Sequence, residues 1–492
     1  MVSAWRVGWF LFPVRVLDYW FLLAMRKIMS ISSKVLFQYH WLQKKGYSYL
    51  YILFLVLILG SCSREEISMS EWEEKGYNAG TEIKQGIPAF EATVIDYKRG
   101  GETILKVRLA EPVVIDVAKK PENWGYFQFP GIYRSEDGKL VASWNMAADA
   151  VTSYGKGESG VAVSNDEGKT WNPLVGTTPL GGGTKLPNGD RIQVRTPKAL
   201  DVKELQLPEA LGKSKENYGR TFVYFKMDDL PQELQGVYLG RLEKGSNAWK
   251  NEHAVLHDPK AVRYVDSGWF PVVWWGDLQV VPDGSVIAGI YPGFYLNDNN
   301  EVPPSGVLFY RSTDNGHSWN LQGKIPYQPD LKTDPNGEKR TAFGFTEPAS
   351  ILLDNGSYLC VMRTTDGLGN SPMYLSHSDD MGVTWTKPVT FTRSGVLPKL
   401  LQLENGVIVL ASGRPGMQLR FALDGRGEIW TDPFEMLPFE GSKEDVSCGY
   451  PQIIPSGPDH FLLIYSDFKY PIGNGEFRKA IKIREIKVTP KR

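Results

Sequence analysis

Three residues in the second half of the sequence combine a base, a nucleophile and an anion-binding group. Glu347 begins a segment expected to form a strand, a tight Asp-Asn-Gly turn and a second strand, and Arg363 ends it. Tyr450 begins a similar segment later in the chain. A glutamate that accepts the phenolic proton makes a tyrosine nucleophilic, and a guanidinium binds a carboxylate through paired hydrogen bonds. These residue types favour covalent catalysis on an acidic substrate if the fold brings them together.

The segment around Glu347 is one copy of a repeat. Each copy is a strand, a turn and a near-apolar second strand, and the copies begin at Phe129, Trp275, Glu347, Leu397 and Tyr450. Glu347 and Tyr450 hold the same place in the repeat, just before the proline of the innermost strand. We therefore expect both side chains to line a common axis, two repeats apart and close enough to couple.

A second motif, Ser-x-Asp-x-Gly-x-(Ser/Thr)-Trp, marks a turn. It occurs three times, ending at Trp171, Trp319 and Trp385, and a degenerate copy ends at Trp430. We expect the aspartate to accept backbone N–H groups within the turn, the glycine to supply a permissive φ, and the tryptophan to pack under the hairpin. These residues are expected to hold structure and to have no catalytic role.

The repeats predict an all-β fold, and specifically a six-bladed β-propeller. Five units are clear, and a sixth, irregular unit fits between Arg191 and Trp249, with residues 221–225 as its best strand. Four-stranded units at this spacing, without helical periodicity, are typical of a propeller. Strands between Ala89 and Leu109 are expected to complete the last unit. A β-sandwich is the alternative, although it would not need the turn motif at a repeated place.

The N-terminal part is not expected to belong to the fold. Residues 1–62 indicate an over-extended start plus a secretory signal, because Lys44-Lys45 precedes a short apolar run and small residues. Leu-Gly-Ser-Cys62 resembles a bacterial lipobox, in which the cysteine is lipidated; an ordinary signal peptide with an incidental cysteine is the alternative. We predict a polar tether over 63–88, a propeller domain over 89–492, and a lipid-anchored protein exported to the bacterial outer membrane, facing the periplasm or the surface.

Composition excludes several classes of partner. A formal net charge of -1 provides no basic excess to neutralise phosphates, so neither nucleic acid nor a polybasic membrane contact is expected. Three cysteines are too few for a disulfide scaffold, and a pairing of Cys360 with Cys448 is left open. The six histidines are scattered without zinc spacing, so no metal or cofactor is expected. The sequence does not indicate an oligomeric state.

The turn motif resembles the Asp-box (BNR) repeat of the sialidase (neuraminidase) superfamily, and the likeness runs from Gln128 to the C-terminal strands. The spacing of Glu347 and Arg363 is similar to that between a sialidase's tyrosine-activating glutamate and its second triad arginine. Arg414, in Ser-Gly-Arg-Pro-Gly, resembles the third triad arginine, and Tyr450, in Cys-Gly-Tyr-Pro-Gln, resembles the nucleophilic tyrosine.

The resemblance implies an exo-glycosidase that hydrolyses a terminal acidic sugar, sialic acid or a related one, from glycans with retention of configuration. Tyr450 would be the nucleophile, Glu347 its base, and Arg363 and Arg414 the groups that bind the sugar carboxylate. A neutral phenol suits this chemistry because the carboxylate would repel an ionised aspartate or glutamate nucleophile.

The sequence departs from the sialidase pattern at Gln128, which stands where the first triad arginine would be. The change removes a charge-assisted contact worth roughly 1.5–3 kcal/mol. Either Arg134, Arg195 or Arg263 substitutes, or the substrate is not an ordinary sialic acid.

The general acid should be an aspartate. Asp149 is the first candidate, although its spacing is offset by about three residues from the sialidase pattern. Asp277, near the axial end of the third unit, is the second candidate for a substrate contact. For both, the alternative is an aspartate that caps a turn. Several aromatic residues could stack on sugar faces, although core packing is expected for most of them: Trp144, Trp274, Trp275 and Tyr291.

Two other functions stay open. The missing arginine allows a propeller enzyme with a different sugar specificity or with lyase chemistry. The turn motif by itself also fits a non-catalytic glycan-binding surface lipoprotein.

Overall fold

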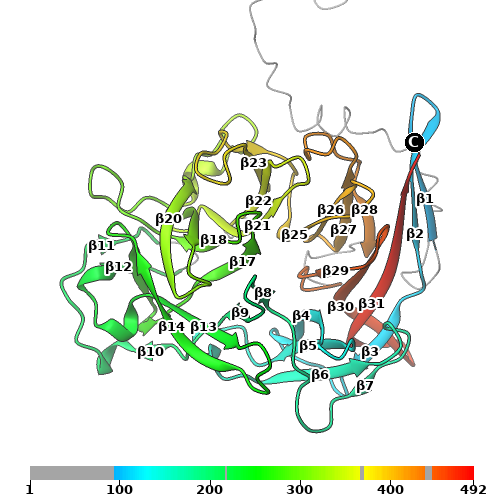
Figure 1. Cartoon of the computed structure of the whole chain (residues 1–492), viewed down its shortest axis with the longest axis horizontal. Coiled ribbons are helices and arrows are strands. Elements are labelled where there is room, and N and C mark those ends of the chain that lie inside the picture. Colours follow the sequence, from blue (N-terminus) through cyan, green and yellow to red (C-terminus); the bar gives the residue numbers. More distant parts are fainter. Residues whose placement is uncertain (1–92, 217–218, 366–370, 438–445, 492) are drawn as a thin grey trace, which may run out of the picture. The chain divides into compact units, whose positions relative to one another are not determined.

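The computed structural model describes residues 93–216, 219–365, 371–437 and 446–491, all of which belong to one compact unit, Ser68–Arg492. Helix in these ranges is limited to short 3-10 segments, at Val151–Ser153, Val202–Glu204, Met227–Asp229, Gln232–Leu234 and Gly337–Lys339. Everything else is strand or turn, as Figure 1 shows. Among the described residues, no helix is long and apolar enough to cross a membrane. The predicted boundaries at 62 and 88 fall outside these ranges and stay predictions.

Three sheets contain four consecutive antiparallel strands each. One holds β4 (Tyr126–Arg134), β5 (Leu140–Met146), β6 (Ser159–Ser164) and β7 (Asn172–Pro173). The second holds β21 (Phe345–Leu352), β22 (Tyr358–Thr364), β23 (Tyr374–Ser378) and β24 (Val389–Thr390). The third holds β25 (Val396–Gln402), β26 (Ile408–Gly413), β27 (Met417–Ala422) and β28 (Phe434–Leu437).

A larger sheet joins two such sets. One set is β17 (Trp275–Val280), β18 (Val286–Gly293), β19 (Gly306–Ser312) and β20 (Ser318–Ile325). The other is β8 (Thr184–Lys185), β9 (Arg191–Val194), β13 (Val237–Leu242) and β14 (Lys250–His257). The two sets meet where the outer strands β14 and β20 pair in parallel.

The last sheet unites both ends of the described chain. It runs β1 (Thr93–Arg99), β2 (Glu102–Leu109), β31 (Glu476–Pro490), β30 (His460–Gly473) and β29 (Gln452–Gly457), and β3 (Val113–Val117) also pairs with β31. Leu109 lies opposite Ile486 in the β2–β31 register. The expectation that strands up to Leu109 complete the last unit is confirmed for residues 93–109.

A separate sheet corrects one prediction. Residues 221–225 were expected in the irregular unit, but β12 (Phe222–Lys226) instead pairs with β15 (Val262–Asp266). The rest of this sheet is β10 (Leu200–Asp201), β11 (Gly212–Lys213) and β16 (Trp269–Phe270). The physical reason is an aromatic cluster of its own, in which Phe222 and Tyr224 pack with Tyr264 and Phe294. The irregular unit is therefore closed by pairing of β9 with β13, and the segment between them leaves the sheet.

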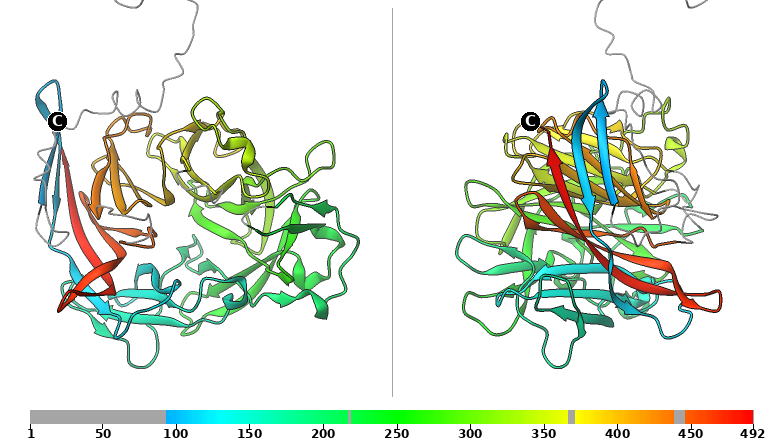
Figure 2. Two further views of the ribbon diagram at one scale, coloured as in Figure 1. Left: turned by 180° about the vertical axis from the view of Figure 1, so that it is seen from behind. Right: turned by 90° about the vertical axis from the view of Figure 1, so that its right-hand side faces the viewer.

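The first strands of neighbouring sheets contact one another in a closed order. β4 contacts β29, β29 contacts β25, β25 contacts β21, β21 contacts β17, and β17 contacts β8. A bridge between Ser135 and Gly181 links the segment before β8 back to the end of β4. This repetition of sheets, which can be followed in Figures 1 and 2, is typical of a β-propeller.

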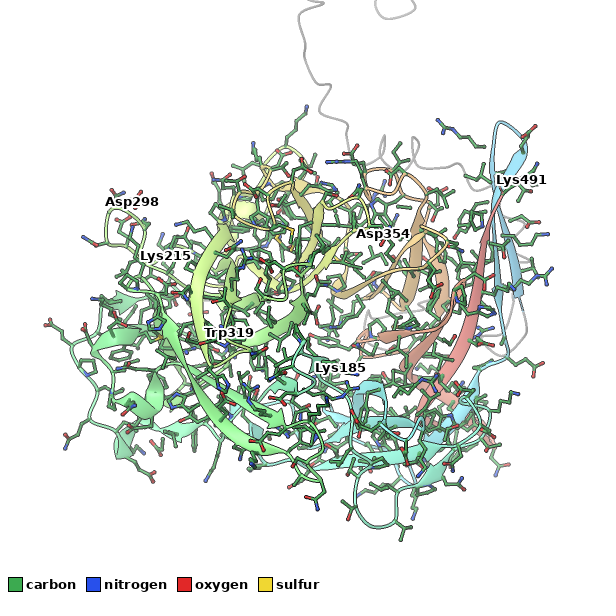
Figure 3. All side chains as sticks on the ribbon, viewed as in Figure 1. Lys185, Lys215, Asp298, Trp319, Asp354 and Lys491 are labelled. Atoms are coloured by element: carbon green, nitrogen blue, oxygen red, sulfur yellow. The ribbon has the colours of Figure 1, made fainter. Side chains whose placement is uncertain are left out.

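The turn motifs have the expected local structure. The backbone N–H of Thr170 donates to Asp166 Oδ1 at 2.9 Å, and the indole N–H of Trp171 donates to the carbonyl of Gly168 at 3.0 Å. Hydrogen bonds from Thr170 lower the pKa of Asp166 to about 2. In the second copy the tryptophan, Trp319, is fully buried between strands, and Figure 3 labels it.

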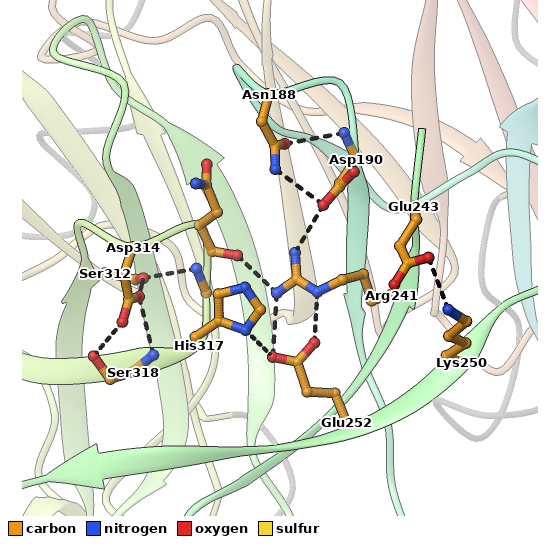
Figure 4. Close-up of polar contacts among 12 residues, drawn as sticks. Asn188, Asp190, Arg241, Glu243, Lys250, Glu252, Ser312, Asp314, His317 and Ser318 are labelled. Atoms are coloured by element: carbon orange, nitrogen blue, oxygen red, sulfur yellow. Dashed lines mark hydrogen bonds and ion pairs between the residues drawn. The ribbon is translucent and has the colours of Figure 1, made fainter. Parts of the chain in front are cut away.

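A polar network fastens the second strand set to the turn before β20 (Figure 4). The buried Arg241 donates to Glu252 at 2.5 and 3.2 Å, to Asp190 at 3.4 Å and to the carbonyl of Asn315 at 2.9 Å. His317 Nδ1 lies 2.6 Å from the same Glu252. Because Arg241 has several acceptors, its burial is compensated and it joins β13, β14 and the turn.

Candidate active site

The site is built on an unusual backbone feature that three sheets share. Phe129, Glu347 and Leu397 each precede a proline and have positive φ angles of 51°, 45° and 39°. At each of them the register between the first two strands of the sheet shifts. Such bulges re-aim a side chain out of the regular alternation of a strand, and non-glycine residues adopt this conformation only where the surroundings enforce it. The repeat position marked by the sequence is therefore a special backbone site.

The structure brings Glu347, Arg363 and Tyr450 into one hydrogen-bonded group. The Tyr450 hydroxyl donates to Glu347 Oε1. Arg363 Nη1 donates to the same carboxylate oxygen at 2.7 Å and to the Tyr450 hydroxyl oxygen at 2.8 Å. The backbone N–H of Leu397, from the bulge of the intervening sheet, donates to Glu347 Oε2 at 2.9 Å. The predicted contact between Glu347 and Tyr450 is present.

The electrostatics keep the phenol neutral. Burial raises the pKa of Tyr450 far above its usual range, and the negative charge of Glu347 adds to this rise, whereas Arg363 and Arg414 oppose it. The Tyr450 hydroxyl therefore carries its proton at neutral pH and points it at Glu347. A tyrosine in this state becomes nucleophilic only when the carboxylate takes the proton as the new bond forms.

Arg414 lies against the ring of Tyr450 and not at its hydroxyl. Its guanidinium carbon is 5.3 Å from the centre of that ring, and its Nε donates to the carbonyl of Cys448 at 3.0 Å. The approach depends on glycine, because a Cβ on Gly413 would lie 2.1 Å from the Cα of Gly449. Arg414 thus borders the nucleophile candidate from the end of β26.

Gln128 has a different environment from a substrate-binding group. The side chain is fully buried, and its Oε1 accepts from the backbone N–H of Gly125 at 2.9 Å. Its Nε2 has no hydrogen-bond partner among the described residues. In this conformation Gln128 supports the loop before β4.

The three arginines considered as substitutes are engaged elsewhere. Arg134 and Arg195 lie beside other side chains, and Arg263 is buried. Their partners are Glu167 for Arg134, the ring of Trp249 for Arg195, and the carbonyl oxygens of Val273 and Gly236 for Arg263. These contacts do not support substitution for the missing arginine.

A cleft of about 280 Å³ holds Asp149. Phe129, Tyr154 and Trp275 form its aromatic walls, and Asp149 and Glu158 supply two carboxylates. The remaining lining groups are small: Asn145, Ala147, Ala148, Ala150, Ser153, Gly155, Gly157, Ser159 and Thr196. The ring of Phe129 also lies 4.9 Å from the ring of Tyr450, centre to centre, so the cleft adjoins the hydrogen-bonded group.

Asp277 does not line this cleft. Its Oδ1 lies 3.4 Å from Nζ of Lys399, which belongs to β25. An aspartate on the first strand of one sheet is thus paired with a lysine on the first strand of another. The contact favours a structural role for Asp277.

The aromatic candidates divide into two groups. Trp274, which packs on Tyr310 and Trp319, and Trp144 are buried core residues, as expected. Trp275 instead lines the cleft. The sequence gave no signal for Trp124, whose indole N–H donates to Asp149 Oδ2 at 2.9 Å, because Trp124 belongs to no repeat.

The cysteine and metal predictions have different outcomes. Cys360 and Cys448 are buried and free, so they do not form a disulfide with each other. Cys62 lies outside the described residues. Within the described ranges, no group of three or more His, Cys, Asp or Glu side chains is placed to hold a metal ion.

No family model and no curated protein matches the sequence. A solved structure from Dyadobacter fermentans, of a protein of unknown function, is similar with a TM-score of 0.51 and 18 % identity, over 77 % of this chain and 99 % of that one. An alpha-L-arabinanase from Penicillium chrysogenum matches with a TM-score of 0.42 and 18 % identity, over 76 % of this chain and 98 % of that one. The NanB sialidase of Streptococcus pneumoniae matches with a TM-score of 0.41 and 14 % identity, over 76 % of this chain and 70 % of that one. The likeness to the Dyadobacter protein concerns the fold alone.

Proposed function

We propose that the protein is a retaining exo-glycosidase in which Tyr450 is the nucleophile. The observation that carries this proposal is the hydrogen-bonded group of Tyr450, Glu347 and Arg363 beside a cleft that holds Asp149. A neutral tyrosine with a carboxylate on its hydroxyl and a guanidinium on both is poorly explained as packing, because such a cluster costs desolvation that apolar residues would avoid.

The reaction would proceed in two displacements. Glu347 accepts the phenolic proton while Tyr450 Oη attacks the anomeric carbon, and Asp149 protonates the departing glycosidic oxygen. The product is a glycosyl–tyrosine ester-like aryl glycoside and a free alcohol. Asp149 then deprotonates a water that attacks the same carbon, and Tyr450 leaves with its proton returned from Glu347. Arg363 donates to Tyr450 Oη and stabilises the charge on it in both steps.

The glycone is proposed to be an acidic sugar. Two guanidinium groups, those of Arg363 and Arg414, border Tyr450 and would attract a carboxylate at the reacting centre. The set lacks a third arginine, because Gln128 is buried. We therefore expect a clamp of two arginines and weaker selection for the carboxylate than three would give.

A second candidate has a specific observation in its favour. Arg414 stacks on the ring of Tyr450 and bonds to the backbone, and no substitute arginine joins it, so a neutral sugar would fit with less reorganisation. The alternatives of lyase chemistry and of glycan binding without catalysis would leave the covalent step out.

The proposal includes the wider setting of the enzyme. We infer a six-bladed propeller, since the strand sets and their closed order of contacts support that count. We also propose export and lipid anchoring at Cys62, on the basis of the lipobox-like sequence. The substrate would then be a glycan outside the cell or in the periplasm.

The test is the release of free sugar from a panel of acidic and neutral α-glycosides. Wild-type protein, Tyr450→Phe and Glu347→Gln are compared at equal folded concentration. Turnover of acidic glycosides that collapses in both variants supports the proposal, and turnover of neutral glycosides alone supports the second candidate. Unsaturated products that absorb in the near ultraviolet would indicate a lyase, and binding without turnover would indicate a glycan-binding protein.

A further inference from the structure

Trp124 contacts two of the groups to which the proposed function assigns roles. Its indole N–H donates to Asp149 Oδ2 at 2.9 Å. The guanidinium carbon of Arg414 lies 5.2 Å from the centre of the Trp124 ring and 5.3 Å from that of Tyr450, so Arg414 is shared between two aromatic rings. Cation–π contacts of this length contribute roughly 0.5–2 kcal/mol each, depending on how far the cation is desolvated.

The ring is fixed by neighbours on its edges. Phe129 and Phe468 meet Trp124 in edge-on contacts, with ring centres 6.4 and 6.3 Å away. Lys479 Nζ, on β31, donates to the carbonyl oxygens of Asn123 at 2.7 Å and Tyr126 at 3.2 Å, on either side of the tryptophan. Trp124 is thus held between the loop and the last sheet.

The loop that carries Trp124 is also pressed against the segment that carries Asp149. Gly125 has a φ of +99°, and a Cβ there would lie 2.3 Å from the carbonyl oxygen of Ala147 and 2.5 Å from the backbone nitrogen of Asp149. Gln128 Oε1 accepts from Gly125 N, and Asn145 Nδ2 donates to the carbonyls of both Gly125 and Ala147 at 2.7 Å. Gln128, at the position of the missing arginine, therefore helps to hold this loop.

We propose that Trp124 is a positioning residue, which sets Asp149 for proton transfer through its indole N–H and sets Arg414 against Tyr450 through its ring. The inference rests on the proposed function and goes beyond it. One oxygen of Asp149 is fixed by the indole, and the other is left to exchange a proton with the glycosidic oxygen and later with water. The same side chain joins the acid to the arginine, so the two are placed together.

This role predicts a particular dependence on the leaving group. A general acid contributes roughly 10²–10⁴-fold when the leaving group is a poor one such as a sugar alkoxide. A nitrophenolate leaves without protonation, so its departure depends little on Asp149. Loss of the indole N–H should therefore slow reactions that need the acid and spare those that do not.

The experiment compares Trp124→Phe with wild type on nitrophenyl and sugar leaving groups of the same glycone. Trp124→Phe keeps an aromatic ring but removes the donor, and we expect kcat for the sugar leaving group to fall about tenfold, while kcat for the nitrophenyl glycoside changes less than about threefold. Asp149→Ala should show the same pattern with a larger loss. Trp171→Phe is the matched control, since it removes an indole donor whose acceptor is the carbonyl of Gly168.

The outcomes separate the inference from the function beneath it. Equal losses on both leaving groups, or none, in a Trp124→Phe protein that unfolds at the wild-type temperature would overturn the positioning role while leaving the glycosidase proposal in place. If folded wild-type protein hydrolyses no member of the panel, the proposed function fails and this inference fails with it. The Trp171→Phe control must not show the leaving-group dependence; if it does, the effect reports general destabilisation and contradicts the assignment.

Discussion

Replacement of Glu347 by glutamine tests both the chemistry and the stability of the site. The carboxylate receives hydrogen bonds from Tyr450, from Arg363 at 2.7 Å and from the backbone of Leu397 at 2.9 Å. Tyr450 can rotate its hydroxyl and accept, but Arg363 and the Leu397 N–H can only donate. Glutamine offers one acceptor oxygen and an NH₂ group, so in either orientation one of these donors faces another donor.

The magnitude follows from the loss of one hydrogen bond that involves a charged group. We expect Glu347→Gln to lower the free energy of unfolding by about 1.5–3 kcal/mol. The loss of the base should lower kcat by roughly 10²–10⁴-fold, equivalent to about 3–5 kcal/mol of activation free energy. Both effects should occur in the same variant, because one carboxylate serves both purposes.

The assay is denaturant unfolding together with glycoside hydrolysis, with Glu243→Gln as the matched control. Glu243 pairs with Lys250 at 2.7 Å, and both side chains are at least half exposed, so its loss should cost less than about 1 kcal/mol. If Glu347→Gln unfolds like Glu243→Gln and retains more than half of the wild-type kcat, the account of this site is refuted.

Two further predictions concern stability. Alkaline pH should destabilise the fold, because burial raises the pKa of several tyrosines above their ordinary value of about 10 and the unfolded chain then releases protons that the folded chain keeps; each such tyrosine should cost about 1.4 kcal/mol per pH unit above 10, up to its folded pKa, in unfolding experiments at increasing pH. The tyrosines concerned include Tyr264, Tyr291, Tyr310 and Tyr450. A free energy of unfolding that stays level from pH 9 to 11 would contradict this. Asp334→Ala should cost about 3–5 kcal/mol, because Asp334 pairs at 2.5 Å with an Arg340 side chain that has no exposed surface; a loss no larger than that of Glu243→Gln in denaturant unfolding would count against it.

The local order of the chain was predictable because it depends on short motifs. The turn motif fixes Asp166 and its neighbours through bonds within a few residues, and the same pattern recurs around Trp319. The proline step marks Glu347, and its repetition before β29 places Tyr450 in the same frame. Periodicity was therefore enough to expect contact between these two side chains, which are far apart in sequence.

Features that depend on long-range packing were not predictable. The strand at 222–226 was recognised, but its partner was wrong, because an aromatic cluster drawn from distant segments decides the pairing. Trp124 belongs to no repeat, and only the folded chain shows it beside Asp149 and Arg414. The burial of Gln128 could not be read from the sequence either, since its partner Gly125 is positioned by contacts with the following strand.

The most direct test of the central claim is to trap the covalent intermediate. A fluorinated glycosyl fluoride slows the second displacement, and peptide mass spectrometry of the treated protein then locates the attached sugar. We predict one sugar per chain, attached to the peptide that contains Tyr450, with none on Tyr450→Phe. A sugar attached to Glu347 or Asp149 would contradict the account, as would turnover of the parent glycoside at the wild-type rate by Tyr450→Phe.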